Sequence, residues 1–70
     1  MAGDLDAGQA ELQKVTATPG YKDAAGWVNL GWIYRNTNKA PESIAAYQKA
    51  LALDPKEEQA ALGLGWAYQY

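Results

Sequence analysis

The stretch Leu30–Tyr34 (LGWIY) recurs as Leu64–Tyr68 (LGWAY), and this recurrence is the feature of the 70-residue chain that indicates its fold. Four of the five residues match, and the interval is 64 − 30 = 34 residues. A period of this length is typical of arrays in which each helix–turn–helix unit buries its apolar face against its neighbours. The sequence therefore predicts an all-α protein built from stacked helix pairs.

Prolines and polar turns divide the chain into separate helical segments. Pro19 and Pro55 follow expected helix ends, and Pro41 suits the first turn of a helix. Asp23 suits an N-cap position, and the run Asn36–Asn38 is typical of a turn. Because the connections are short, consecutive helices are expected to lie antiparallel. The expected helices are 4–18, 23–36, 41–53 and 57–70.

Helical phase predicts one buried stripe on each of these helices. The repeated glycines, Gly31 and Gly65, fall within the stripes. We expect them where one helix crosses closely over another, which compensates roughly 1 kcal/mol of helix propensity lost relative to alanine. In chain order, the stripes are Leu5, Gly8, Leu12 and Val15; Trp27, Leu30, Gly31 and Tyr34; Ser43, Ile44, Tyr47, Ala50 and Leu51; and Ala61, Leu64, Gly65 and Tyr68.

The second and fourth helices carry a further apolar face. Trp32 lies about 140° around the helix from Trp27, so the two rings cannot share a stripe. Ala25 and Val28 lie on the face of Trp32, and Leu62 and Trp66 form the equivalent face of the fourth helix. A helix that is apolar on two faces lies between layers or presents one face to a ligand.

The segment Ala24–Glu57 resembles one complete tetratricopeptide repeat. Its residues fill the W-x2-L-G-x2-Y pattern of that family and the later slots for a large aromatic residue, a small residue and a proline. Ser43 departs mildly, because alanine is usual there. The matching residues are Trp27, Leu30, Gly31, Tyr34, Tyr47, Ala50 and Pro55.

By this resemblance, 1–22 corresponds to the second helix of a preceding repeat plus a linker, 23–57 to one complete repeat, and 58–70 to the first helix of a following repeat. The chain thus looks like a piece of a longer array. The implied fold is a right-handed α-solenoid of antiparallel helix pairs. The alternative is a closed four-helix bundle, in which the fourth helix packs back on the first.

The resemblance also implies a function, because the first helices of successive repeats in this family line a concave groove that holds peptides. The expected partner is a protein or peptide segment with apolar anchors; alternatively, a neighbouring helix or another chain covers the tryptophans. Family members that clamp terminal carboxylates carry Lys and Asn where this chain has Val28 and Trp32, which argues against that subclass, although Asn29 reaches the groove edge. The expected groove is apolar with a polar end, and comprises Ala25, Val28, Trp32, Arg35, Leu62, Trp66 and Gln69.

The competing function is structural self-assembly. The first and last helices resemble complementary halves of one repeat, so two molecules can associate head to tail. The expected contact joins Leu64 and Tyr68 of one molecule to Leu5 and Leu12 of the next.

Composition argues against several other functions. The chain has no Cys and no His, which removes thiol nucleophiles, the usual zinc ligands and the commonest general base near neutral pH. Its net charge of −2, with acids and bases interspersed, predicts neither a nucleic-acid nor an anionic membrane surface. No apolar run approaches the roughly 20 residues of a membrane span, and the N-terminus does not resemble a signal peptide. We therefore expect a soluble, cytoplasmic, non-enzymatic protein without cofactor or metal.

Overall fold

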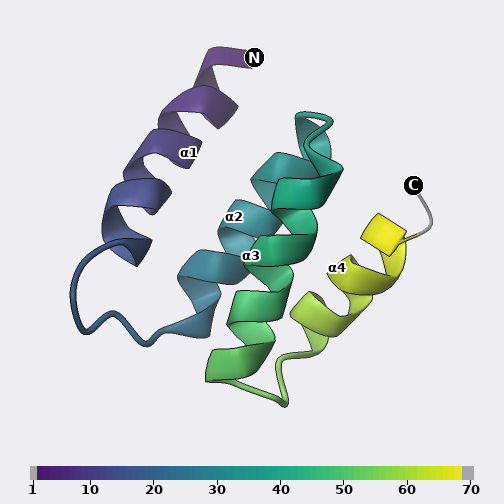
Figure 1. Ribbon diagram of the computed structural model, residues 1–70. Coiled ribbons are helices and arrows are strands. Elements are labelled where there is room, and N and C mark those ends of the chain that lie inside the picture. The colour runs from purple at the N-terminus through teal and green to yellow at the C-terminus, as the bar shows by residue number, and fades with distance from the viewer. Residues whose placement is uncertain (1, 69–70) are drawn as a thin grey trace.

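A computed structural model describes residues 2–68, which form four α-helices (Figure 1). The described bounds differ from the predicted ones by no more than two residues, and no strand occurs within residues 2–68. The predicted all-α fold is therefore confirmed. The helices are α1 (Ala2–Thr16), α2 (Ala24–Asn36), α3 (Ala40–Leu53) and α4 (Glu58–Tyr68).

The connections explain where the helices begin and end. Asp23 caps α2 as predicted, because its Oδ1 accepts a hydrogen bond from the backbone N–H of Ala25 at 3.0 Å. Pro41 lies in the first turn of α3. Asn38, in the turn between α2 and α3, has a φ of 61°, the left-handed region that asparagine tolerates better than most residues.

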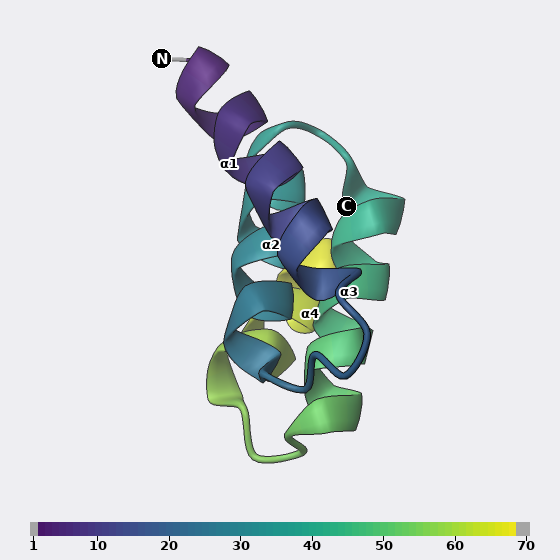
Figure 2. The ribbon, with the colours of Figure 1, turned by 90° about the vertical axis from the view of Figure 1, so that its left-hand side faces the viewer.

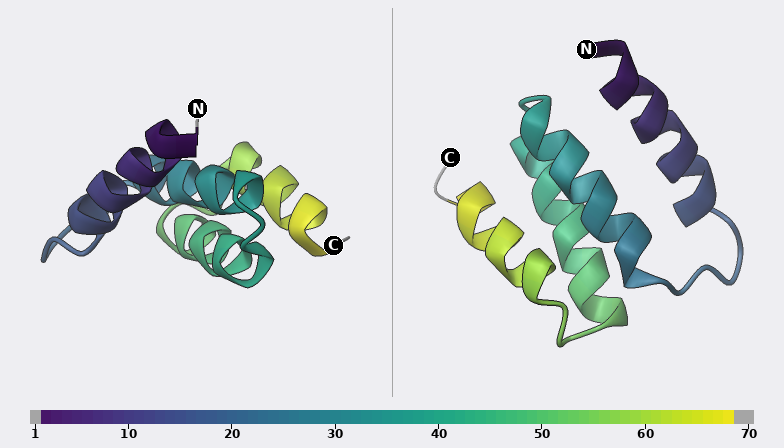
Figure 3. Two further views of the ribbon diagram at one scale, coloured as in Figure 1. Left: turned by 90° about the horizontal axis from the view of Figure 1, so that it is seen from above. Right: turned by 180° about the vertical axis from the view of Figure 1, so that it is seen from behind.

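The helices are arranged as in an array of stacked pairs and not as in a closed bundle. Helix α2 contacts α1, α3 and α4, whereas α1 makes no contact with α3 or α4 within the described residues. Figure 2 shows α1 crossing in front of α2, and the view from above in Figure 3 shows α2 between α1 and α4, with α3 to one side. The handedness of the solenoid remains a prediction.

The core lies where α2, α3 and α4 meet, and Tyr47 of α3 is at its centre. The Tyr47 ring is only 2% exposed and lies against two glycines, Gly31 of α2 and Gly63 of α4. A Cβ atom on Gly31 would lie 2.7 Å from the ring, so these glycines provide the space that the aromatic side chain fills. Ser43 is fully buried and its hydroxyl donates to the Gly31 carbonyl at 2.8 Å, which satisfies this polar replacement of the usual alanine.

The predicted buried stripe of α4 is wrong. Ala61, Gly65 and Tyr68 are exposed and Leu64 is half-buried, while the residues that face the core are Ala60, Gly63 and Ala67. The equivalent stripe of α2 is covered by α3, whereas no described element lies over this face of α4. Residues at equivalent positions of the 34-residue period are therefore not equally buried in α2 and α4.

Two smaller corrections concern α1 and α2. Val15 is 45% exposed, because α1 meets α2 through its other residues: a Cβ on Gly8 would lie 3.4 Å from Cδ1 of Ile33. Trp27 and Tyr34 are half-buried and not fully buried as expected. They face a shallow pocket that opens between α2 and α3, where the Lys49 ammonium lies 6.0 Å from the Trp27 ring.

Candidate functional site

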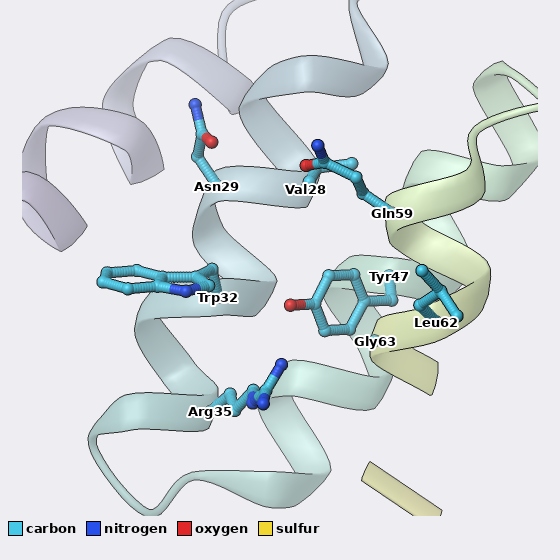
Figure 4. A pocket seen from close by; sticks show the side chains of 8 residues that line it. All are labelled: Val28, Asn29, Trp32, Arg35, Tyr47, Gln59, Leu62 and Gly63. Carbon is cyan, nitrogen blue, oxygen red and sulfur yellow. The ribbon is translucent and has the colours of Figure 1, made fainter. Parts of the chain in front are cut away.

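A pocket of about 410 Å³ lies between α2 and α4, with α3 forming its floor (Figure 4). The two walls are helices that occupy equivalent positions in the 34-residue period, so they present equivalent residues to the same space. The lining residues are Val28, Asn29, Trp32, Arg35, Tyr47, Gln59, Leu62 and Gly63. We call this pocket the α2–α4 groove.

Val28, Trp32 and Leu62 are apolar side chains that line the groove. Val28 of α2 is nearly buried at 8% exposure, whereas Leu62 on the opposite wall is 75% exposed. Trp32 lies on the α2 rim with 51% of its surface exposed. The two walls therefore present apolar area to solvent at a place where α3 cannot cover it.

Polar groups lie at both ends of the groove, the amides of Asn29 and Gln59 at one end and the Tyr47 hydroxyl and Arg35 toward the other (Figure 4). The Tyr47 hydroxyl points from α3 toward α2, and Arg35 extends toward it (Figure 4). Burial raises the pKa of Tyr47, and the positive charge of Arg35 and its hydrogen bond to the phenol oppose this rise in part. The Arg35 guanidinium also lies 4.4 Å from the centroid of the Trp66 ring, which is within cation–π distance. Arg35 thus connects all three core helices.

Four of the seven residues predicted for the groove line this pocket, namely Val28, Trp32, Arg35 and Leu62. Trp66 stands at its edge, against Arg35. Ala25 is exposed but lies outside the lining, and Gln69 lies outside the described residues.

Four lining residues were not among the seven predicted groove residues. Tyr47 was interpreted only as core, yet its hydroxyl belongs to the groove floor. Gln59 and Gly63 stand 34 residues after Ala25 and Asn29. The same period that pairs Val28 with Leu62 could therefore have indicated them as groove residues. The fourth is Asn29, which lines the pocket although it was not one of the seven predicted residues.

The groove contains few kinds of polar group. Its lining contains amide, phenol and guanidinium groups but no carboxylate, thiol or imidazole. Within the described part of the chain, no group of three or more Cys, His, Asp or Glu side chains is placed to hold a metal ion. None of the helices in residues 2–68 is both long and apolar enough to cross a lipid bilayer.

Comparison with known families gives a match for the central segment of the chain. The family model of the tetratricopeptide repeat matches residues 24–57, the segment that the motif spacing had picked out. The segment 24–57 therefore matches one tetratricopeptide repeat, and such repeats generally mediate protein–protein interactions. No curated protein and no solved structure shows a significant match to the chain.

Proposed function

We propose that this protein is a scaffold that binds a protein or peptide segment in the α2–α4 groove, with apolar side chains of the partner as anchors. In this proposal, α1 and α4 serve as the adjoining halves of a preceding and a following repeat. The observation that carries the proposal is the exposure of Trp32 and Leu62, at 51% and 75%, on the two rims of one pocket.

Exposed apolar residues that gather around a concavity support a binding role more strongly than the same residues scattered singly. A tryptophan at such a rim supplies a large contact area with little side-chain entropy to lose, and for this reason tryptophans are enriched among the residues that dominate binding energy. The backbone of Trp32 lies within α2, which places its ring beside the groove.

The test is the variant Trp32→Ala, assayed with peptides selected from a random display library on the immobilised wild-type chain. We expect the selected peptides to lose about 2 kcal/mol of binding energy, roughly a 30-fold rise in Kd. The free energy of unfolding should change by less than about 1 kcal/mol, because half of the ring is already in solvent.

Val15→Ala is the matched control, because Val15 is also exposed, at 45%, but lies on α1 outside the groove. It should leave peptide affinity unchanged. Selected peptides that bind Trp32→Ala as tightly as the wild type would refute the groove proposal, as would a Trp32→Ala variant that unfolds.

A second candidate function is head-to-tail self-assembly, and the environment of Gly65 favours it. Gly31 lies against the Tyr47 ring, but its counterpart Gly65 has no heavy atom within 4 Å of an added Cβ. Tyr68, one turn further on, is 64% exposed. The outer face of α4 is thus an apolar surface of the kind that α3 covers on α2.

The proposed contact places Tyr68 and Leu64 of one molecule against Leu5 and Leu12 of the next. Leu5, Leu12 and Leu64 are already half-buried within one molecule, which leaves Tyr68 as the main contributor of new contact area. At about 25 cal/mol per Å² of apolar area, a few hundred Å² gives several kcal/mol, which is comparable with the cost of association. Association should therefore be weak and dependent on concentration.

Sedimentation equilibrium from micromolar to millimolar concentration measures this association. We expect a rising average mass for the wild type and a smaller rise for Tyr68→Ser. A wild-type chain that stays monomeric throughout the range would exclude the self-assembly candidate and leave the groove proposal intact.

A further inference from the structure

Arg35 is the only charged residue in the lining of the α2–α4 groove. The other polar groups there are the amides of Asn29 and Gln59 and the phenol of Tyr47, all of which are neutral at pH 7. The whole chain carries a net charge of −2, yet this pocket presents a positive charge beside an apolar wall. A small segment inside the groove therefore interacts mainly with the positive charge of Arg35 and not with the net charge of the chain.

The Arg35 guanidinium is held in a defined position by two contacts from other helices. Its central carbon lies 4.4 Å from the centroid of the Trp66 ring of α4, and the group lies beside the Tyr47 hydroxyl of α3, whose pKa it lowers. A guanidinium carries five N–H donors in one plane, so these contacts leave donors for a ligand. A planar donor group fixed in this way suits a carboxylate, which it can bind through two parallel hydrogen bonds.

The spacing along α2 indicates how far the carboxylate lies from the apolar anchor. The apolar wall is centred between Val28 and Trp32, and Arg35 follows about five residues later, or about 7 Å along the helix axis. In an extended peptide, side chains that point to the same side recur every two residues, also about 7 Å. One apolar and one acidic side chain at alternate positions therefore match the wall and the arginine together.

We propose that the groove selects extended segments in which an acidic side chain stands two residues from a bulky apolar one, with Arg35 binding the side-chain carboxylate. This inference rests on the proposed function of the groove. A side chain is the better source of the carboxylate than a chain end, because the guanidinium lies at the depth of the Tyr47 hydroxyl on the groove floor. Side chains of an extended segment reach that depth more readily than its backbone does.

Three synthetic peptides test the proposal by NMR titration of the wild-type chain. The first is acetyl-Ala-Glu-Ala-Leu-Ala-Glu-Ala-amide, which offers a carboxylate at the required spacing in either chain direction. The second replaces both Glu residues by Gln. The third is acetyl-Ala-Gln-Ala-Leu-Ala with a free terminal carboxylate, which tests the chain-end source.

We expect the Glu peptide to bind about tenfold more tightly than the Gln peptide, and the chain-end peptide to bind like the Gln peptide. The indole N–H signal of Trp66 should move with the Glu peptide only, because the carboxylate contacts the guanidinium stacked on that ring. In Arg35→Gln the tenfold preference should disappear. Lys49→Gln, which removes a charge from an exposed residue outside the groove, should retain it.

Arg35→Lys provides a second variant should Arg35→Gln fail to fold. It keeps the charge but loses the planar donor group, so we expect about a threefold preference for Glu. Equal binding of the Glu and Gln peptides to the wild type would overturn the proposal about Arg35 while leaving the groove function standing. Stronger binding of the chain-end peptide would also overturn it. Failure of every peptide to bind at millimolar concentration would overturn both proposals.

Discussion

Replacing Gly63 by alanine is expected to destabilise the fold by about 2–3 kcal/mol, whereas the same replacement at Gly65 is expected to stabilise it by about 0.5–1 kcal/mol. An added Cβ on Gly63 would overlap the ring of Tyr47, a residue that is only 2% exposed. An added Cβ on Gly65 would meet nothing within 4 Å, so only the gain in helix propensity remains. Two neighbouring glycines of one helix should thus respond with opposite signs.

Urea denaturation followed by circular dichroism at a helix band measures both effects as shifts of the midpoint. Gly31→Ala is the matched third variant, because its Cβ would lie 2.7 Å from the same ring, and it should shift the midpoint in the direction of Gly63→Ala. If Gly63→Ala and Gly65→Ala shift the midpoint in the same direction, the packing described around Tyr47 is wrong.

Tyr47→Ala is expected to leave the chain unfolded at 25 °C. Removing a buried aromatic ring costs about 3–5 kcal/mol. A single core in a chain of this size rarely supplies more than about 3–5 kcal/mol in total. The cavity would also separate α2, α3 and α4 at the point where all three meet. Tyr47→Phe keeps the ring and loses only the hydrogen bond to Arg35, so we expect a cost of about 1 kcal/mol.

Circular dichroism and the spread of amide signals in an NMR spectrum distinguish these outcomes. Tyr68→Ala is the control for loss of a tyrosine as such, because Tyr68 is 64% exposed and its hydroxyl only accepts an exposed hydrogen bond from Gln48. It should remain folded. A folded, cooperatively melting Tyr47→Ala variant would show that the ring does not hold the three helices together.

The fold was predictable from the sequence because the 34-residue recurrence and the turn residues are local signals. Asp23 caps α2, and Asn38 adopts the left-handed conformation in the predicted turn. The recurrence does not indicate which helix packs against each face of a given helix. Gly31 and Gly65 occupy equivalent positions in the motif, yet only Gly31 lies under a ring, because α3 covers α2 and no described helix covers that face of α4.

The sequence predicted residues on the two walls of the candidate site but not the residue on its floor. Helical phase separated Trp32 from the core stripe and paired Val28 with Leu62, and all three line the groove. The role of Tyr47 was missed because phase assigns a residue to one face, whereas a tyrosine can bury its ring and still present its hydroxyl elsewhere. That direction depends on the spatial relation of α3 to α2 and α4, which no single helix encodes.

The position of Tyr47 also limits how the shape of the α2–α4 groove can change by substitution. The rim residues Trp32 and Leu62 are largely in solvent, so substitutions there alter the groove without a large penalty to the fold. Tyr47 belongs to the floor of the groove and to the core at once, so a change that remodels the floor must also preserve the packing against Gly31 and Gly63. Substitutions that change the groove should therefore arise first at the rims, while Tyr47 is retained on the floor.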